Sequence, residues 1–326
     1  MGLPVAGRRM AVIGATGFIG SHLTECLVRN GADVLVVARS TRRLQNLEAV
    51  ASDCRFALSD ILDRDSLGAA LGEFKPEVVF HLAADIDAGE TFAHMAASLE
   101  SNAIGTANVL EAASSAGSAV FVYADSCKVY GNGPVPYRQA QPEAPICSYA
   151  IAKAAGWRLC RLASALTGMA VCGLRSTFTY GPRQNPNLIT HARDCVARGV
   201  PVRLLGGSQT RDLLYVDDAV RAYVAAATQP AARGCSVPIG GGRELSVVEI
   251  CREIVSLMGS RIEVIAGAQQ PRLTEIWRSY CDNAEAKDLL GWSPAVSLSE
   301  GLSRTLLDGA AGVPSRGADR ASAASE

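Results

Sequence analysis

The chain has 326 residues, of which 48% are hydrophobic, and its 31 Lys and Arg residues nearly balance 32 Asp and Glu residues. This composition can fill a sizeable core, which excludes a disordered chain, and the formal net charge of −1 disfavours nucleic acid as a partner. Because no run of about 18 uncharged apolar residues occurs, we also expect no membrane-spanning helix.

The cysteines, histidines and first residues bear on metal binding and location. The ten cysteines are scattered and include no Cys-x-x-Cys pair, and the four histidines show no metal-ligand spacing. We therefore predict no metal site. The first ten residues lack the apolar core of a secretory signal, so we expect a cytoplasmic protein.

The first half of the chain alternates short apolar runs with segments of helical periodicity. Four runs indicate strands, at residues 10–13, 34–38, 78–82 and 120–123. Three segments indicate helices, at residues 19–30, 65–74 and 97–116. Runs of Val, Ile and Leu without polar alternation are typical of strands buried on both faces. We therefore predict an α/β fold built on a Rossmann-type doubly wound parallel sheet.

Prolines and glycine pairs interrupt this rhythm after about residue 172. We predict a dinucleotide-binding domain over 1–172 and a smaller, mixed substrate-binding lobe over 173–312, interleaved with the first domain. The last residues, 313–326, have no periodicity and are expected to form a disordered tail.

A glycine-rich turn, Gly14-x-x-Gly17-x-x-Gly20, follows the first strand directly and opens the first helix. The first glycine permits the tight turn, the second lets backbone approach a pyrophosphate, and the third allows close helix–strand packing. The N–H groups of the helix start then face the phosphates. The residues predicted to contact a dinucleotide here are Gly14, Thr16, Gly17, Phe18, Ile19 and Gly20.

The end of the second strand bears on the choice of dinucleotide. An acidic residue there would hold the ribose 2′-hydroxyl of NAD, but Ala38 is followed by Arg39 and Ser40. Arg42 and Arg43 add further positive charge, which favours a 2′-phosphate. We predict NADP, contacted by Arg39 and Ser40, with NAD as the alternative. The other interpretation of these arginines is a solvated loop.

Tyr149 and Lys153 form a Tyr-x-x-x-Lys pair, which shares one face of a helix. An ammonium beside a phenol is expected to lower the phenol pKa from about 10 toward neutrality. Tyr149 could then take the proton of an alcohol while its carbon gives a hydride to the dinucleotide. Ser126, at the end of an apolar strand, would hydrogen-bond the same oxygen.

Four further segments occur in order along the chain: His81-Leu82-Ala83-Ala84, Tyr180-Gly181-Pro182-Arg183, Arg211-Asp212-Leu213-Leu214-Tyr215-Val216-Asp217-Asp218 and Leu290-Gly291-Trp292-Ser293-Pro294. Together with the motifs above, they make the chain resemble the extended short-chain dehydrogenase/reductases that act on nucleotide sugars, from about residue 10 to 306. The resemblance implies an enzyme that oxidises the sugar at C4 through bound NAD(P)+. It also implies a nucleotide-diphosphate sugar as substrate and a homodimer.

The resemblance further implies roles for single residues. Near the cofactor, Asp60 and Ile61 would border the adenine, Leu82, Ala83 and Ala84 would leave room for the dinucleotide, and Asn102 would support the active-site backbone. Substrate contacts are implied for Ser126, Phe178, Asn187, Leu188, Arg211 and Arg272, with the two arginines on the diphosphate.

Two departures from the family pattern concern the reaction and the substrate. In the 4,6-dehydratases an acid commonly follows the catalytic Ser or Thr, and the next residue removes the C5 proton. Here the pair is Cys127-Lys128, in which the thiol could donate a proton and the lysine could act as base. This pair slightly favours dehydration over epimerisation. Phe178 stands where relatives usually carry Asn, which bears on substrate identity.

Other functions remain open at this point. If Cys127 is only a small core residue, the enzyme is an epimerase or a reductase. Arg39 also suits an NADPH-dependent reductase of a 4-keto-deoxysugar. A function of another class would be a non-catalytic NAD(P)-binding scaffold or sensor.

Overall fold

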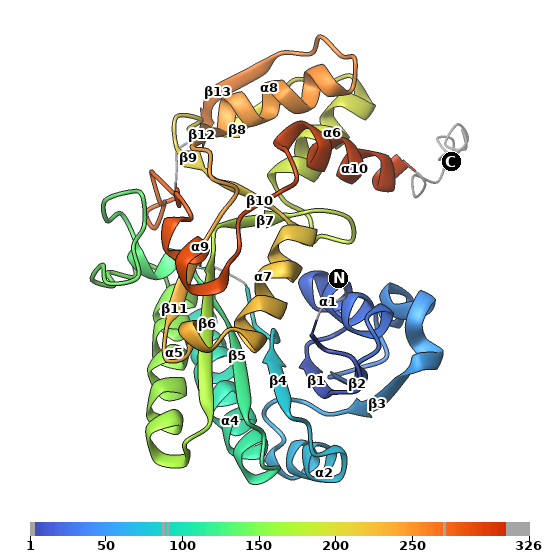
Figure 1. The fold of residues 1–326 in the computed structure, drawn as a ribbon. Coiled ribbons are helices and arrows are strands. Elements are labelled where there is room, and N and C mark those ends of the chain that lie inside the picture. Colours follow the sequence, from blue (N-terminus) through green and yellow to red (C-terminus); the bar gives the residue numbers. More distant parts are fainter. Residues whose placement is uncertain (1–3, 87–88, 90, 270–271, 311–326) are drawn as a thin grey trace, which may run out of the picture.

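A seven-stranded parallel sheet forms the lower part of the molecule in the view of Figure 1. The computed structural model describes residues 4–86, 89, 91–269 and 272–310, so the predicted tail lies outside the described residues. In spatial order the strands are β11 (Ser236–Ile239), β6 (Ala170–Ser176), β5 (Val120–Ser126), β4 (Val78–His81), β1 (Arg9–Ile13), β2 (Asp33–Ala38) and β3 (Cys54–Leu58). The predicted α/β fold with a Rossmann-type sheet is confirmed.

Helices cover both faces of this sheet, which explains its uninterrupted apolar strands. On one face lie α1 (Phe18–Arg29), α7 (Val216–Thr228) and α9 (Ala284–Leu290). On the other lie α2 (Arg64–Phe74), α4 (Gly105–Ser115) and α5 (Ser148–Thr167). Successive strand residues point to opposite faces, so Val12 packs with the first group of helices and Ala11 with the second.

The predicted helix at 97–116 is the main difference between the expected and observed elements. It consists of α3 (Phe92–Leu99), a π-helical turn at Glu100–Ile104, and α4. The turn contains Asn102, which is fully buried. Single π-helical turns of this kind are frequently found at functional sites.

The second half of the chain adds three two-stranded sheets beside the large one. They pair β7 (Phe178–Tyr180) with β10 (Leu213–Tyr215), β9 (Thr210–Arg211) with β12 (Leu245–Ser246), and β8 (Val202–Leu205) with β13 (Val264–Gln269). The helices α6 (Leu188–Arg198), α8 (Val247–Leu257) and α10 (Leu298–Ala310) pack with them. Short 3₁₀ segments lie at Leu44–Asp53 (η1), Cys127–Tyr130 (η3) and Pro230–Ala232 (η4).

Strand β11 and helix α7 return from this second half to the large sheet, and the predicted boundary at residue 172 falls inside β6. Within the described part of the chain, no helix combines the length and the apolarity needed to cross a membrane.

The carboxyl ends of β1, β4 and β5 meet at one edge of the sheet. Their register places Ile13 beside His81 and His81 beside Tyr123. The chain order of the strands reverses between β1 and β4, and such a reversal opens a crevice beyond the strand ends. The glycine-rich turn after β1 and Ser126 at the end of β5 therefore face the same edge.

Candidate functional site

The glycine-rich turn between β1 and α1 has the steric constraints expected for it. Gly14 has a φ of +89°, and a Cβ there would lie 2.6 Å from the backbone N of Ala83. A Cβ at Gly20 would lie 2.2 Å from the carbonyl O of Gly14. Real Cβ atoms do not approach backbone so closely, so larger residues at these two positions would displace the loop or the helix.

The start of α1 suits the phosphates of a dinucleotide. The helix is preceded by Gly17, which has no side chain to cap it, and its first turn contains no acidic residue. Its N–H groups and positive dipole end are therefore directed to the crevice without a competing anion from its own first turn. Thr16, Phe18 and Ile19 lie half-buried around this turn. These residues fit the predicted cofactor.

The loop after β4 is fastened against the same turn. The backbone N–H groups of Leu82 and Ala83 both donate to Ile13 O at 2.9 Å. Asn102 accepts the N–H of Asp85 at 2.9 Å and donates to its carbonyl at 2.7 Å. The implied support of the backbone by Asn102 fits this geometry. Direct contact between Asn102 and the cofactor does not, because its amide is used on Asp85.

The segments after β2 and β3 are expected to meet the adenosine half of the cofactor. Arg39 is exposed and Ser40 half-buried at the end of β2, whereas Arg43 donates to Asn185 Oδ1 at 2.9 Å. After β3, Asp60 Oδ1 accepts the N–H of Leu62 at 3.0 Å. Ile61, the next residue, accepts a bond on its carbonyl from Asn108 Nδ2 at 2.9 Å, so both hydrogen bonds hold this segment in place.

Ser126, Tyr149 and Lys153 lie together at the end of β5 and the start of α5. Tyr149 shares a hydrogen bond with Ser126. Lys153 Nζ lies 5.9 Å from the centroid of the Tyr149 ring and donates to Ala124 O at 2.8 Å. Lys128 Nζ lies 5.4 Å from the same centroid. The structure thus brings three of the other four predicted catalytic side chains, those of Ser126, Lys128 and Lys153, to the phenol of Tyr149.

The pKa of that phenol departs from the expected direction. Burial raises the pKa of Tyr149 well above its ordinary value, and the nearby charge of Asp125 raises it further, while the bond with Ser126 opposes them. The Lys153 ammonium directs a hydrogen bond to Ala124 O and not to the phenol. Burial in turn lowers the pKa of Lys153 to about 8. Tyr149 therefore rests as a phenol in the free protein.

Replacing Lys153 by Met is expected to stabilise the fold by about 2 kcal/mol at pH 7. Moving the Lys153 pKa from 10.5 to about 8 destabilises the folded state by roughly 3 kcal/mol, of which about 1 is offset by the bond to Ala124. Because the folded pKa is the lower one, the unfolded chain binds more protons above pH 8. The gain should therefore shrink as the pH rises from about 8 to 10.5.

Urea unfolding of Lys153→Met across this pH range checks the prediction, with Lys287→Met on α9 as the exposed-lysine control. A variant that is less stable than the unchanged chain at pH 7 would show that the buried ammonium is a net stabiliser.

The structure does not support Cys127 as a proton donor. Its side chain is buried, and the thiol donates to Arg175 O at 2.9 Å and lies 3.6 Å from the Cys281 sulfur. It belongs to a small core cluster with Tyr130 and Tyr137. The alternative interpretation of Cys127, as a small core residue, describes these contacts.

Lys128, beside the Tyr149 ring, has two arginines of the second-half elements near it. The pKa of Lys128 is lowered by burial of its ammonium and by the charges of Arg211 and Arg272, against the effect of Cys147. The guanidinium of Arg211 donates to Ile276 O at 2.8 Å and pairs with Glu275. Arg272 is exposed. This arrangement can receive an anionic group such as a diphosphate.

The remaining predicted substrate contacts lie on the second-half elements. Asn187 caps α6, accepting from Ile189 N at 2.9 Å and Thr190 N at 3.3 Å, and its amide nitrogen donates to Gln184. Its side chain thus caps α6, and its predicted contact with substrate stays a prediction. Phe178 and Leu188 are half-buried against the core of these elements, and no contact places them in the group around Tyr149.

A charged network beneath Ser126 was not predicted. Asp125 Oδ1 accepts the backbone N–H of Ser126 at 2.8 Å, and its Oδ2 accepts Arg175 Nε at 2.8 Å and Ser236 Oγ at 2.7 Å. Arg175 also donates to Tyr130 Oη at 2.9 Å and pairs with Glu143. The signal in the sequence was a charged residue at the end of each of two apolar strands, 124–126 and 174–176.

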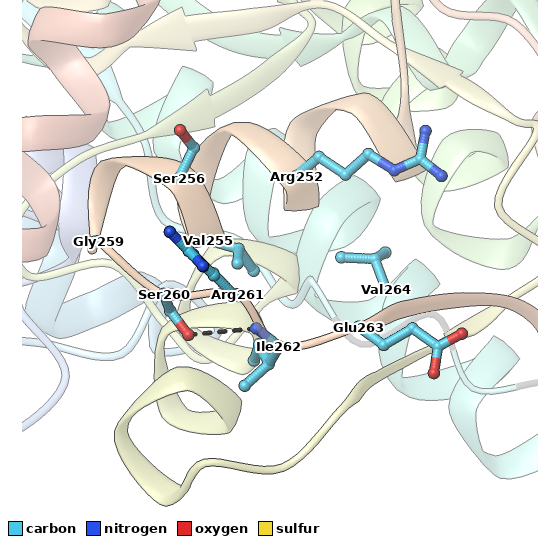
Figure 2. Close-up of a pocket in the computed structure, with 9 residues that line it drawn as sticks. All are labelled: Arg252, Val255, Ser256, Gly259, Ser260, Arg261, Ile262, Glu263 and Val264. Carbon is cyan, nitrogen blue, oxygen red and sulfur yellow. Dashed lines mark hydrogen bonds between the residues drawn. The ribbon is translucent and has the colours of Figure 1, made fainter.

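A cavity of about 580 Å³ lies elsewhere, at the end of α8 and the segment before β13 (Figure 2). Its walls include Arg252, Arg261 and Glu263, and it contains none of the predicted site residues. The candidate site is therefore defined by the converging side chains at the sheet edge rather than by cavity size.

Comparison with known proteins agrees with this geometry. A sequence profile described as the NAD dependent epimerase/dehydratase family matches residues 10–240. The chain belongs to this family. It is also 35% identical over 308 residues to a UDP-glucose 4-epimerase of Mycolicibacterium smegmatis, covering 91% of this chain and 97% of the relative.

Two solved structures of epimerases are similar throughout. A UDP-glucose 4-epimerase from Thermotoga maritima, solved with UDP-glucose, superposes with a TM-score of 0.87 at 29% identity, over 93% of this chain and 99% of that one. A UDP-glucuronic acid 4-epimerase from Bacillus cereus, in complex with UDP-glucuronic acid and NAD, gives a TM-score of 0.84 at 28% identity, over 92% and 98%. The residues matched by the profile of the NAD dependent epimerase/dehydratase family include the glycine-rich turn and the group around Tyr149.

Proposed function

We propose that the protein is a nucleotide-sugar 4-epimerase whose Tyr149 removes the proton from the C4 hydroxyl and later returns it. The dinucleotide supplies the acceptor for the C4 hydride. Ser126 donates to the same sugar oxygen and fixes its position, and the ammonium of Lys153 stabilises the phenolate that forms. Support comes from the contacts among these three side chains beside the glycine-rich turn.

The position of Cys127 favours epimerisation over dehydration. A dehydratase needs a proton donor for the departing hydroxyl in addition to the base that acts on the carbon. The thiol at this position donates to Arg175 O inside the core, and so it is unavailable to a substrate. Epimerisation requires proton transfer only at the C4 oxygen, which Tyr149 can perform in both directions.

Dehydration is the second candidate, and Lys128 favours it. Its Nζ lies 5.4 Å from the Tyr149 ring, and its pKa is lowered by burial and by two neighbouring arginines. A lysine of lowered pKa can act as a base on carbon.

Product analysis separates the two reactions. Incubation with UDP-glucose, followed by mass spectrometry and NMR of the product, is expected to show an isomer of unchanged mass. We expect Cys127→Ala and Lys128→Ala each to retain kcat for epimerisation within about threefold, since neither side chain transfers the C4 proton. Lys128→Ala should raise KM, because it removes one of the cations near the proposed diphosphate site. A product lighter by the mass of one water would instead indicate a dehydratase, if Lys128→Ala no longer forms that product.

We propose a uridine diphosphate sugar as substrate. The similar proteins above are named for UDP-glucose and UDP-glucuronic acid. In this chain Lys128, Arg211 and Arg272 supply the positive charge that a diphosphate requires.

Preference for NADP stays a prediction, because the family is described as NAD dependent and the Bacillus cereus structure contains NAD. The preference depends on Arg39, which is exposed, whereas Arg43 is bound to Asn185. Dissociation constants for NAD+ and NADP+, measured on the unchanged chain and on Arg39→Ala, decide it. Tighter NADP+ binding that is lost in the variant is the expected result for an NADP enzyme.

We propose that α3 and α5 form the interface of a homodimer. The two helices pack together and expose large apolar side chains, among them Phe92 at 89% and Leu166 at 76%. Such side chains on adjacent helices are typical of a protein interface. Light scattering is expected to show a dimer, weakened in Leu166→Glu and unchanged in Leu307→Glu on α10. A monomeric unchanged chain would contradict the proposal.

A further inference from the structure

The segment 181–187, between β7 and α6, is bound to α1 and η1 by Arg183. One guanidinium nitrogen, Nη1, donates to Glu25 Oε1 at 2.7 Å and to Asn46 O at 2.5 Å. The other, Nη2, lies 2.9 Å from His22 Nδ1. The acceptors belong to α1 and η1, so a single side chain connects the second-half elements to the dinucleotide-binding part of the chain.

The partners match a guanidinium in both charge and hydrogen-bonding direction. His22 Nε2 lies 3.1 Å from Pro182 O, so this nitrogen carries the hydrogen and Nδ1 is free to accept from Arg183. Glu25 supplies the negative charge, and both side chains of the ion pair are largely buried. Arg183 also has a φ of +65°, which non-glycine residues rarely adopt, so the surrounding bonds hold it in this conformation.

The same group of residues reaches the glycine-rich turn itself. Asn46, whose carbonyl accepts from Arg183, donates through Nδ2 to the carbonyl of Thr16 at 2.9 Å. A second connection joins Arg43 to Asn185 at 2.9 Å. In Figure 1 the segment after β7 lies above α1, where its contacts with His22 and Glu25 are made. We call the contacts of Arg183 with Glu25, Asn46 and His22 the Arg183 clasp.

We propose that the Arg183 clasp retains the dinucleotide by holding segment 181–187 across the crevice beside the glycine-rich turn. This inference depends on the proposed use of that turn for the cofactor. A dinucleotide whose phosphates lie at Thr16 and Gly17 can leave only when the second-half elements separate from α1. Separation breaks a charged, largely buried set of hydrogen bonds, which slows dissociation rather than changing association. Arg183 is thus a positioning residue that does not touch the reacting atoms.

Retention of the dinucleotide suits an epimerase, since the hydride taken from C4 has to be returned before the cofactor leaves. The sequence alone presents Arg183 only as part of the Tyr-Gly-Pro-Arg segment. Its role depends on α1 and η1, which lie more than a hundred residues earlier in the chain.

The test measures the release of NAD+ from the full chain, without any sugar substrate. Arg183→Ala removes the clasp. Glu25→Gln weakens it, because it replaces the carboxylate by an uncharged amide of nearly the same size. Arg29→Ala is the matched control, because Arg29 pairs with the other oxygen of Glu25 at 3.2 Å and is exposed. Each protein is loaded with NAD+, and exchange against excess isotopically labelled NAD+ is followed over time.

We expect release to be at least about tenfold faster in Arg183→Ala and intermediate in Glu25→Gln, with Arg29→Ala unchanged. If Arg183→Ala does not fold, Glu25→Gln carries the test, with the melting temperature of the NAD+-free protein as a check on folding. Equal NAD+ release rates for the wild-type protein, Arg183→Ala and Glu25→Gln would overturn the inference. An unchanged chain that binds NAD+ but acts on no sugar would overturn only the proposed reaction.

Discussion

Replacing Tyr149 by Phe is expected to reduce turnover by roughly a thousandfold while the dinucleotide remains bound. The change removes one oxygen atom, the only atom of this side chain able to exchange a proton with the C4 hydroxyl. Proton transfer by a positioned side chain typically accelerates a reaction by about 10²–10⁴-fold. Ser126 and Lys153 remain in place but cannot substitute, because Ser126 is a weak base and Lys153 donates to Ala124 O.

The surroundings of Tyr149 indicate which kinetic constant its replacement changes. Because burial raises the pKa of its phenol, ionisation in the active site needs the support of Ser126 and of positive charge. The ring itself packs in the same way in the variant, so binding of substrate and cofactor should change little. The loss should therefore fall on kcat rather than on KM.

Steady-state kinetics of Tyr149→Phe with UDP-glucose, together with NAD+ binding, provide the measurement. Tyr180→Phe is the matched control: it makes the same chemical change at a buried tyrosine of the second-half core, whose hydroxyl donates to Leu298 O at 3.4 Å. Turnover that survives in Tyr149→Phe would remove the proposed acid–base role.

The sequence predicted features that depend on short-range pattern. Strands β1, β2, β4 and β5 and helices α1 and α2 begin and end close to the expected residues, because buried parallel strands and amphipathic helices differ in the period of their apolar residues. The glycine-rich turn was predicted because its steric requirements lie within seven residues, from Gly14 to Gly20. Family resemblance added Ser126, which a strand end alone would not identify.

Features that depend on pairing between distant segments could not be predicted in this way. Cys127 was a candidate proton donor because it stands where the 4,6-dehydratases commonly carry an acid, with a small core residue as the alternative. Its contacts come from the distant residues Arg175 and Cys281. The pKa of Tyr149 depends on how deeply the fold buries its side chain. The cap that Asn187 forms depends on where α6 begins, and no sequence pattern indicated that start. Local sequence does not determine which side of a turn faces the core.

Replacing Arg175 by Met is expected to destabilise the protein by about 3–5 kcal/mol, because it leaves Asp125 as a buried, unpaired charge. The register of β5 and β6 places Asp125 directly beside Arg175, and both side chains are almost completely buried. Glu143 keeps a second partner in Arg158, so the loss is concentrated on Asp125. The backbone N–H of Ser126 also depends on that carboxylate.

The pH dependence of this variant follows from the raised pKa of Asp125. Burial raises the pKa of the Asp125 carboxyl, and the bonds from Arg175 and Ser236 oppose that rise. Without Arg175 the folded pKa moves further up, so the folded state binds its proton more readily than the unfolded chain does. The destabilisation is therefore smallest at acidic pH and grows as the pH rises above the unfolded pKa of about 4.

Denaturant unfolding at several pH values tests this interpretation, with the double variant Asp125→Asn/Arg175→Met as the decisive comparison. The double variant is expected to recover much of the lost stability, because an amide at position 125 carries no charge and can still accept from Ser126 N. Arg158→Met, which removes an exposed partner of Glu143, should cost less than about 1 kcal/mol. A double variant as unstable as Arg175→Met would show that packing of the guanidinium, and not the unpaired carboxylate beneath Ser126, accounts for the loss.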